Sequence, residues 1–309
     1  MRDCSRRDFM LQVGQGAAVA GAGALGIGLL EGEALAADAR VVVVRGTDPR
    51  KMLMAALTVF KGLSPIVKGK KVVLKPNMSF KNPSAWGNNT SPEVAVALAT
   101  LIAEAGAASI TAVDHTMGQG GQSIESCGVG PALRKVKGCQ VVSAHNKAEY
   151  VKKRVVKGKQ LKTVEIPQVA AAGEVLINVP VAKHHAATKA GFGLKNLMGL
   201  VWDRRHFHEE ISLHQGIADL ATLLRPALTV IDATRVMVNN GPQGPGKVEK
   251  LDTIIVSTDP VAADAVALSL TKWNNQNLVP RDVEHIQAAA LLGLGVADLA
   301  QIKIIKKRA

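Results

Sequence analysis

The sequence predicts an α/β fold with a mainly parallel sheet flanked by helices, and two observations support this. Short β-branched runs alternate with helical patterns along the chain, as in repeated β-α-β units. Hydrophobic residues make up 47% of the 309 residues but aromatic residues only 3%, so Val, Ile, Leu and Ala must build the core. That composition is typical of parallel strands buried between two layers of helices.

Eight segments carry the strand pattern and six carry the helical pattern. The predicted strands span residues 41–45, 71–75, 109–113, 140–143, 174–178, 227–231, 253–257 and 302–305. The predicted helices span residues 49–61, 92–105, 131–137, 209–224, 260–271 and 281–292. Two helix starts are explicit, because Ser91-Pro92-Glu93 and Asp259-Pro260 each place an N-cap residue before a first-turn proline.

Residues 150–167 break the alternation of strands and helices. Apolar and basic residues alternate there on both sides of Gly158, which is the pattern of a two-stranded ribbon. We therefore predict a small antiparallel excursion from the main sheet, within a single domain that spans residues 38–309. Two loops rich in Gly, Pro or Asn, at 80–90 and 239–247, are expected to rim a site.

Residues 1–37 have the organisation of a twin-arginine export signal. Ser5-Arg6-Arg7-Asp8-Phe9-Met10 precedes a weakly apolar Gly/Ala segment at 13–30, and Ala34-Leu35-Ala36 is a small-x-small cleavage site. We therefore expect the twin-arginine export machinery as a partner and a periplasmic location, reached by an already folded chain. A retained N-terminal anchor is the alternative to cleavage. No later segment is apolar and long enough to cross a bilayer, so the mature protein is not expected to span the membrane.

The net charge and the number of cysteines limit the kinds of ligand and cofactor that the protein could bind. The formal net charge of +13 favours small anions. Nucleic acid is not expected, because the protein is exported and few aromatic side chains are present for base stacking. Cys4 lies in the signal, so Cys127 and Cys139 remain, and two thiols cannot supply the four ligands of an iron–sulfur cluster. The cofactor stays open, with a divalent metal as one candidate.

Polar side chains follow five of the predicted strands. In an open parallel sheet, ligands bind beyond the carboxyl ends of the strands, so these side chains would meet at one edge if all five strands are parallel. They are Lys75 with Asn77, Asp114 with His115, Asn178 with Lys183, His184 and His185, Asp232, and Ser257 with Asp259. Asp259 is more simply explained as a helix N-cap. For Asp114 and Asp232, an ordinary role in ending a strand and a role in the site are equally favoured.

Side chains able to bind ligands or transfer protons are most concentrated between residues 183 and 214, which contain five of the eight histidines. This segment is expected to bind anions, because arginine holds a carboxylate or phosphate with two parallel hydrogen bonds. Its cations are Lys183, Lys189, Lys195, Arg204 and Arg205. A lysine desolvated among other cations can also lose its proton and act as a base or nucleophile.

His206 and His208 form an H-x-H pair in the same segment. The two rings could bind a metal together if this piece of chain is extended, because alternate side chains of a strand share a face. Asp114 or Asp232 would then add a carboxylate ligand. The alternative is that the pair is a surface or anion-binding feature, which is the more common role of an isolated H-x-H.

Six segments, in order along nearly the whole predicted mature chain, carry a family resemblance. They read VVLKPNMSF, NTSPEVAVAL, INVPVAKHHAATKAGFGLKNLMGL, IADLATLLRPALTVIDA, GPQGPG and VSTDPVAADAVAL. With the K-N-x-M-G run at 195–199 and the T-D-P-V-A-x-D-A run at 258–265 as its most specific parts, the chain resembles the bacterial and archaeal domain-of-unknown-function family 362. The resemblance implies the α/β fold and a site near these segments. Some members carry a ferredoxin-like insertion with cysteine clusters, which this sequence lacks.

The leading hypothesis is a periplasmic enzyme that acts on a small anionic substrate, with or without a bound metal. Catalytic roles are predicted for Lys183, His184, Lys195, Asn196, Asp114 and Asp232, substrate binding for Lys75, Asn77, Arg204 and Arg205, and metal binding for His206 and His208. A non-catalytic anion-binding protein and a redox accessory protein are the alternatives. All of them depend on one expectation, that segment 183–214 folds over the edge where the strands end.

Overall fold

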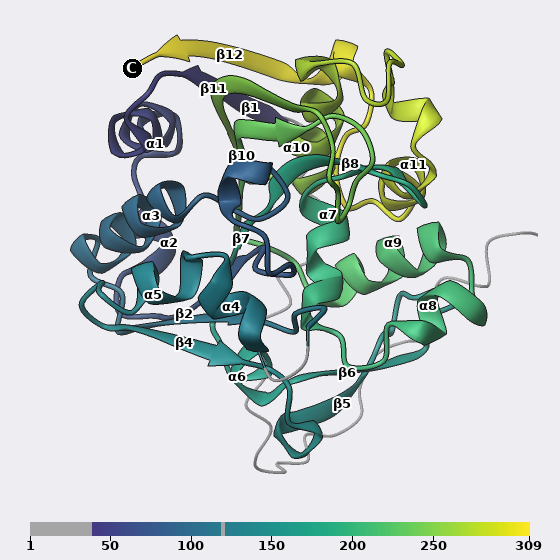
Figure 1. Cartoon of the computed structure of the whole chain (residues 1–309). Helices are drawn as coiled ribbons and strands as arrows, with labels where there is room; N and C mark the ends of the chain where they lie inside the picture. The colour runs from purple at the N-terminus through teal and green to yellow at the C-terminus, as the bar shows by residue number, and fades with distance from the viewer. Residues whose placement is uncertain (1–38, 119–120) are drawn as a thin grey trace, which may run out of the picture. The chain divides into compact units, whose positions relative to one another are not determined.

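The computed structural model describes residues 39–118 and 121–309, and the predicted export signal lies outside them (Figure 1). The strands of the main sheet are β1 (Arg40–Arg45), β2 (Lys71–Pro76), β3 (Ser109–Asp114), β4 (Cys139–Ser143), β7 (Val175–Val179), β8 (Val181–His185), β9 (Lys189–Gly191), β10 (Leu228–Met237), β11 (Val248–Ser257) and β12 (Lys303–Arg308). Their order is β12-β1-β11-β10-β7-β2-β3-β4, and β8 pairs with β10 and β9.

The sheet is mainly parallel, as predicted, because β4, β3, β2, β7 and β10 all run in one direction. Strand β11 is antiparallel to both of its neighbours, β10 and β1. A short connection at 238–247 joins β10 to β11, and only antiparallel neighbours can be joined without a long crossover.

This reversal corrects one part of the predicted site. Ser257, at the carboxyl end of β11, pairs with Thr229 near the start of β10, so Ser257 and Asp259 lie at the opposite edge from Asp232. The prediction that five strands present polar groups at one edge is therefore wrong for β11. Asp259 acts as the N-cap of the following helix, accepting a hydrogen bond from Ala262 N at 2.8 Å.

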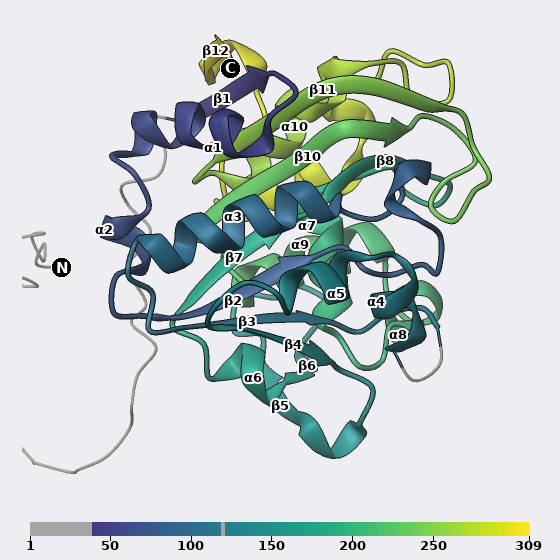
Figure 2. The same ribbon diagram turned by 60° about the vertical axis from the view of Figure 1, so that its left-hand side comes forward.

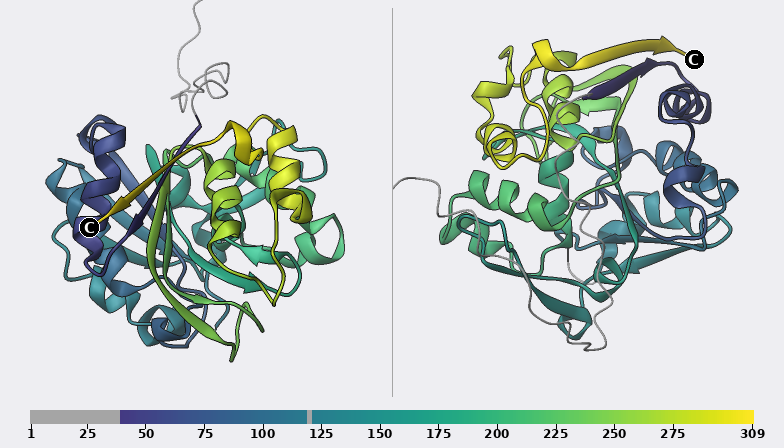
Figure 3. Two further views of the ribbon diagram at one scale, coloured as in Figure 1. Left: turned by 90° about the horizontal axis from the view of Figure 1, so that it is seen from above. Right: turned by 180° about the vertical axis from the view of Figure 1, so that it is seen from behind.

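Helices cover both faces of the sheet (Figures 2 and 3). One face packs against α1 (Pro49–Leu57), α2 (Ser64–Val67), α3 (Pro92–Glu104), α4 (Gln122–Ser126) and α5 (Val129–Leu133). The other packs against α7 (Gly193–Asn196), α9 (Leu213–Leu223), α10 (Pro260–Ala267) and α11 (Glu284–Leu291). Because side chains alternate across a strand, Val72 and Leu74 of β2 enter the first core and Val73 enters the second. Double burial explains why these strands are almost continuously apolar.

The predicted ribbon is also present. Strands β5 (Tyr150–Arg154) and β6 (Thr163–Pro167) pair only with each other, in antiparallel register, and α6 (Gln168–Ala171) follows directly. Helix α8 (Arg205–Glu209) packs beside α9. Among the described residues, no helix combines the length and the apolar character that a bilayer crossing requires.

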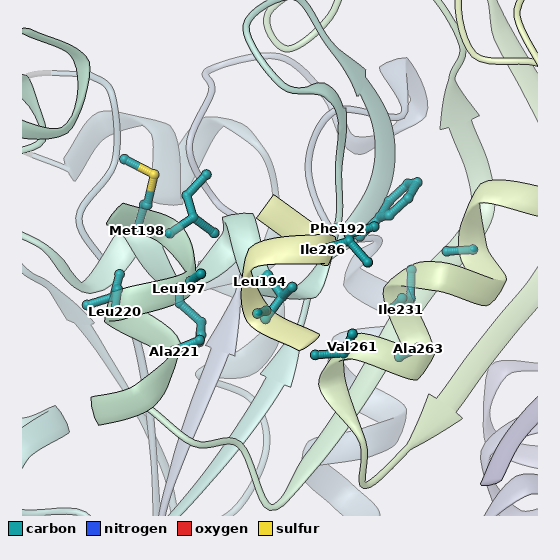
Figure 4. Close-up of a cluster of buried hydrophobic side chains, with 14 of the residues drawn as sticks. Phe192, Leu194, Leu197, Met198, Leu220, Ala221, Ile231, Val261, Ala263 and Ile286 are labelled. Atoms are coloured by element: carbon teal, nitrogen blue, oxygen red, sulfur yellow. The ribbon is translucent and has the colours of Figure 1, made fainter. Parts of the chain in front are cut away.

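Segment 183–214 has regular structure along much of its length. It contains the end of β8, strand β9, helix α7, a 3₁₀ turn at Leu197–Leu200 and helix α8. Figure 4 shows Leu194 and Leu197 of this segment among apolar side chains of α9 and α10, such as Leu220 and Val261. Burial of these leucines fixes the position of Lys195 and Asn196, which lie between them in the sequence.

Candidate functional site

The carboxyl ends of β2 and β3 meet segment 183–214 at α7 and the turn after it. Lys75 is the next-to-last residue of β2, and Asp114 ends β3. Asn196 of α7 reaches β2, because its Nδ2 donates to the carbonyl oxygen of Lys75 at 3.0 Å. His115 N donates to the carbonyl oxygen of Gly199 at 2.8 Å, which ties the end of β3 to the same turn.

Lys75 and Asp114 form a fully buried ion pair. Lys75 Nζ lies 3.0 Å from Asp114 Oδ1, and both side chains are 0% exposed. Asp114 Oδ2 accepts a hydrogen bond from Met78 N at 2.7 Å. Gly199 packs directly on this pair, since a Cβ there would overlap Asp114 Oδ1 and would lie 2.7 Å from Lys75 Nζ. The glycine of the K-N-x-M-G run therefore permits a close approach that a larger residue would prevent.

Three buried asparagines connect the strand ends to α7. Asn77 Nδ2 donates to Asn196 Oδ1 at 3.1 Å, and Asn196 Nδ2 donates to Asn178 Oδ1 at 2.8 Å. Asn178 Nδ2 in turn donates to the carbonyl oxygen of Gly193 at 2.8 Å. Because every member has a partner, this network fixes the side-chain amide orientations and holds α7 against β2 and β7.

Lys183 is a buried lysine in the middle of β8. Its Nζ donates to the carbonyl oxygen of Asn88 at 2.5 Å and lies 3.4 Å from Asn77 Oδ1 and 4.9 Å from the centroid of the Phe80 ring. Burial and the nearby ammonium of Lys195 together lower the pKa of Lys183 to about 7, although Asp114 opposes the shift. Lys183 therefore changes its charge near neutral pH.

Four cationic side chains lie close enough together that the charge of one lowers the pKa of another. We call Lys75, Lys183, Lys195 and Arg204 the cation cluster. Burial lowers the pKa of Lys195 to about 8, with Arg204 adding to the effect. Burial also lowers the pKa of Lys75, although Asp114 counteracts it. Asp114 is the one carboxylate that opposes these shifts within the described residues, so the cluster carries an excess of positive charge.

Asp264 of α10 holds the start of α7. Its two carboxylate oxygens accept hydrogen bonds from Gly193 N at 2.8 Å and from Leu194 N at 3.0 Å, which are the free donors of the first helical turn. Burial raises the pKa of Asp264 to about 7 despite these two hydrogen bonds. The T-D-P-V-A-x-D-A segment thus contributes to the site by positioning Lys195 and Asn196.

The structure places two of the predicted catalytic residues in hydrogen bonds that connect loops to strands. Asp232 Oδ2 accepts from Ser91 N at 2.7 Å, and Asp232 Oδ1 accepts from Thr234 N and Thr234 Oγ1 at 2.9 and 2.7 Å. His184 Nδ1 accepts from Gly241 N at 3.1 Å, which attaches the 239–247 loop to β8. Both side chains therefore attach loops to strands of the sheet.

The two adjacent arginines have different environments. Arg204 is partly buried, and its Nη1 and Nη2 donate to the carbonyl oxygens of His115 and Thr116 at 2.9 and 3.1 Å. Arg205 is exposed, with its Nε 3.5 Å from Glu209 Oε2. Of the two, Arg204 is the one that lies with the cation cluster.

We expect Arg204→Lys to destabilise the protein by about 1–2 kcal/mol, because a lysine cannot span both carbonyl oxygens with one fork of donors. The midpoint of urea unfolding measures this cost. Arg205→Lys is the matched control and should leave the midpoint unchanged, since an exposed ion pair contributes little. Equal midpoints for the two variants would contradict the assigned role of Arg204.

His206 and His208 lie on helix α8, so the extended geometry on which the metal prediction depended does not occur. Residues two apart on a helix point roughly 200° apart and cannot share a face. His206 Nδ1 lies 2.8 Å from Glu210 Oε2, and the ring lines a cavity of about 270 Å³ between α8 and the ribbon. Among the described residues, no three His, Cys, Asp or Glu side chains are grouped so as to hold a metal ion.

Sequence reasoning missed a cluster of rings beside Asp114. His115 stacks on Trp202 with ring centroids 5.3 Å apart, and His145 and Tyr150 meet the His115 ring edge-on at 4.9 and 6.0 Å. We call these four residues the His115 cluster. Its one sequence signal was the position of His115 directly after a strand-ending aspartate; Tyr150 and Trp202 come from distant segments.

Both cysteines of the predicted mature chain are free thiols. Burial raises the pKa of Cys127 and of Cys139 to about 11. Because the thiolate is the reactive form of cysteine, these two side chains are poor nucleophiles and poor metal ligands near neutral pH.

Comparisons with known proteins agree with the sequence segments described above. The sequence model of a domain of unknown function (DUF362) matches residues 72–269. A thylakoid-associated protein of Synechocystis sp. is 25% identical over 241 residues, which are 75% of this chain and 71% of that protein. The solved structure of the lactate racemase apoprotein from Thermoanaerobacterium thermosaccharolyticum is similar at a TM-score of 0.48 and 13% identity, over 71% of this chain. The similarity spans about half of that structure's own chain, 54%.

The family match covers β2, β3, β7 and α7, and with them the cation cluster, the buried ion pair and the asparagine network. It ends just after α10, which carries Asp264. Since the match extends over more than half of the 309 residues, the chain belongs to the DUF362 family.

Proposed function

We propose that this protein is an enzyme that binds a small carboxylate- or phosphate-bearing substrate at the cation cluster and transfers a proton on it. The observation that carries the proposal is the burial of several cationic side chains with a single opposing carboxylate. Lys75 is 0% exposed and Lys183 is 5% exposed, while Asp114 is already paired with Lys75. Burying a charge without a partner is costly, so a bound anion would relieve a strain that the protein otherwise carries.

The chemistry of the donors indicates the class of substrate. Ammonium groups and a guanidinium are strong donors to carboxylate and phosphate oxygens, and the amides of Asn77 and Asn196 add fixed polar groups beside them. A pKa of about 7 for Lys183 and of about 8 for Lys195 places both lysines near the pH at which proton transfer is most effective. These features together support acid–base chemistry on a small anion.

We expect oxalate or sulfate, which keep their charge between pH 6 and pH 9, to bind more tightly at low pH. Lys183 must be protonated to attract an anion, so binding drives proton uptake, and affinity should fall by about tenfold per pH unit above its pKa. Titration calorimetry at pH 6.5 and pH 8.5 measures Kd, and repeating it in buffers of different ionisation enthalpy measures the protons taken up.

Lys183→Met should weaken binding by at least about tenfold and remove most of the proton uptake. Lys306→Met is the matched control, because Lys306 is an exposed lysine on the edge strand β12 and its loss changes the net charge equally. The proposal fails if neither anion binds, or if the two variants bind with the same affinity.

We also propose that the protein works in the periplasm, exported in the folded state by the twin-arginine route. The support is the sequence at residues 5–10 and the Ala34-Leu35-Ala36 site. Cell fractionation of the full chain beside an Arg6→Lys/Arg7→Lys variant tests this. Equal amounts of both chains in the periplasmic fraction would contradict it.

A further inference from the structure

We propose that His115 is the residue that transfers the proton to and from the bound anion, a step that rests on the function proposed above. His115 follows Asp114 directly at the end of β3. Arg204 of the cation cluster donates to its carbonyl oxygen at 2.9 Å. Arg204 and Asp114 also act electrostatically on the imidazole itself, so the ring is within range of the charged groups at this edge of the sheet.

Hydrogen bonding fixes which nitrogen of His115 is available. Nδ1 lies 2.8 Å from the carbonyl oxygen of Val201, and a carbonyl oxygen can only accept, so Nδ1 carries the hydrogen. Nε2 then bears the lone pair. Among the described residues, no hydrogen-bond partner contacts Nε2. A backbone carbonyl on one nitrogen and a free lone pair on the other is the arrangement of an oriented base.

Packing holds this imidazole in one orientation. The ring lies nearly parallel to Trp202, at an interplanar angle of 13°, and the rings of His145 and Tyr150 meet it edge-on. Tyr150 is itself fixed, since its hydroxyl donates to the carbonyl oxygen of Ala144 at 2.8 Å. A base whose position is set before the substrate arrives loses little conformational entropy on reaction.

The surroundings also set the charge states of the reaction. Burial lowers the pKa of His115 and Arg204 lowers it further, so the ring is neutral and able to accept a proton. Nε2 would take a proton from a C–H or O–H group next to the anionic group, and the electron pair would stay on the substrate. The resulting imidazolium would be favoured by Asp114 and would return the proton when product forms.

His145 differs from His115 in the use of its nitrogens. Its Nε2 lies 2.8 Å from Thr116 Oγ1, so that nitrogen is already engaged. We therefore assign the transfer to His115.

Nitrogen NMR of the full chain labelled with ¹⁵N-histidine tests the assignment, with His115→Gln identifying the His115 signals by their loss. We expect Nδ1 protonated and Nε2 unprotonated. Saturation with oxalate or sulfate should move the Nε2 signal and raise the midpoint of the His115 titration by at least about half a pH unit, because a nearby anion favours imidazolium. His115→Gln should keep anion affinity within about threefold while lowering proton uptake on binding, whereas His206→Gln, on the surface helix α8, should leave that uptake unchanged.

The outcomes distinguish a failure of the His115 assignment from a failure of the proposed function. An anion that binds by calorimetry without moving the His115 signals, or an Nε2 found protonated, overturns the role of His115 and leaves the proposed function standing. Failure of either anion to bind overturns both.

Discussion

Asp114→Ala is expected to destabilise the protein by about 3–5 kcal/mol at pH 7, the cost of leaving a buried charge without its partner. Lys75 would keep its ammonium at 0% exposure, beside Lys183 and Arg204, with no carboxylate to oppose them. Met78 N would also lose its acceptor. Urea unfolding of the full chain, followed by circular dichroism, measures the loss.

The pH dependence separates this cause from simple loss of packing. Burial lowers the pKa of Lys75 in the folded protein, so the unfolded chain binds more protons in the alkaline range and stability rises with pH there. The penalty of Asp114→Ala should therefore shrink between pH 7 and pH 10 as Lys75 loses its proton. A penalty that is the same at both pH values would indicate a cavity effect instead.

The double variant Lys75→Met/Asp114→Ala supplies the control. With both charges removed, much of the stability lost in the single variant should return, since an apolar replacement of a buried ion pair is often tolerated. A double variant no more stable than Asp114→Ala would show that the ion pair does not explain the loss.

Much of the fold could be predicted because doubly buried strands leave a strong signal. The apolar runs at 71–75 and 109–113 correspond closely to β2 and β3, and the capping residues Ser91 and Asp259 mark the starts of α3 and α10. These features depend on neighbouring residues in the sequence. Local chemistry is therefore enough to reveal them.

The direction and the length of β11 depend on tertiary structure and were missed. Apolar residues alone marked residues 253–257, whereas β11 begins at Val248 and its first half carries Glu249 and Lys250. Pairing with an equally long β10 stabilises this polar half, and a partner strand cannot be seen in a local pattern.

The candidate site shows the same limit. Lys75, Asn77, Asp114 and Asn196 could be predicted, because each stands at a strand end or in a dense polar segment. The free nitrogen of His115 could not, because it depends on Val201, which lies 86 residues away. Likewise, the sequence pattern left a turn role and a catalytic role equally open for Asp232, because its hydrogen bonds to Ser91 and Thr234 form only in the folded chain.

His285→Phe is expected to stabilise the protein, with the larger gain in acid. His285 is 0% exposed, and both its ring nitrogens lack hydrogen-bond partners among the described residues. Its ring stacks on His214 of α9, with centroids 5.7 Å apart, and Lys195 lies near enough to disfavour a second charge. A phenyl ring of similar shape would keep the stack and remove two unsatisfied polar atoms, each of which costs about 1–3 kcal/mol.

The acid effect follows from the lowered pKa of His285, about 3 in the folded protein because of burial. An ordinary histidine in the unfolded chain titrates near 6.5, so between pH 6.5 and pH 3 the unfolded state binds the extra proton and the wild type loses stability as pH falls. At pH 5 this loss amounts to about 2 kcal/mol, which His285→Phe should restore.

Urea unfolding at pH 7.5 and pH 5 measures the gain in stability at each pH. The control is His206→Phe on the surface helix α8, which should change stability by no more than about 0.5 kcal/mol. If His285→Phe gains no more at pH 5 than at pH 7.5, the histidine must be protonated or partnered in the folded protein, and the packing of α11 against α9 would need a different electrostatic account.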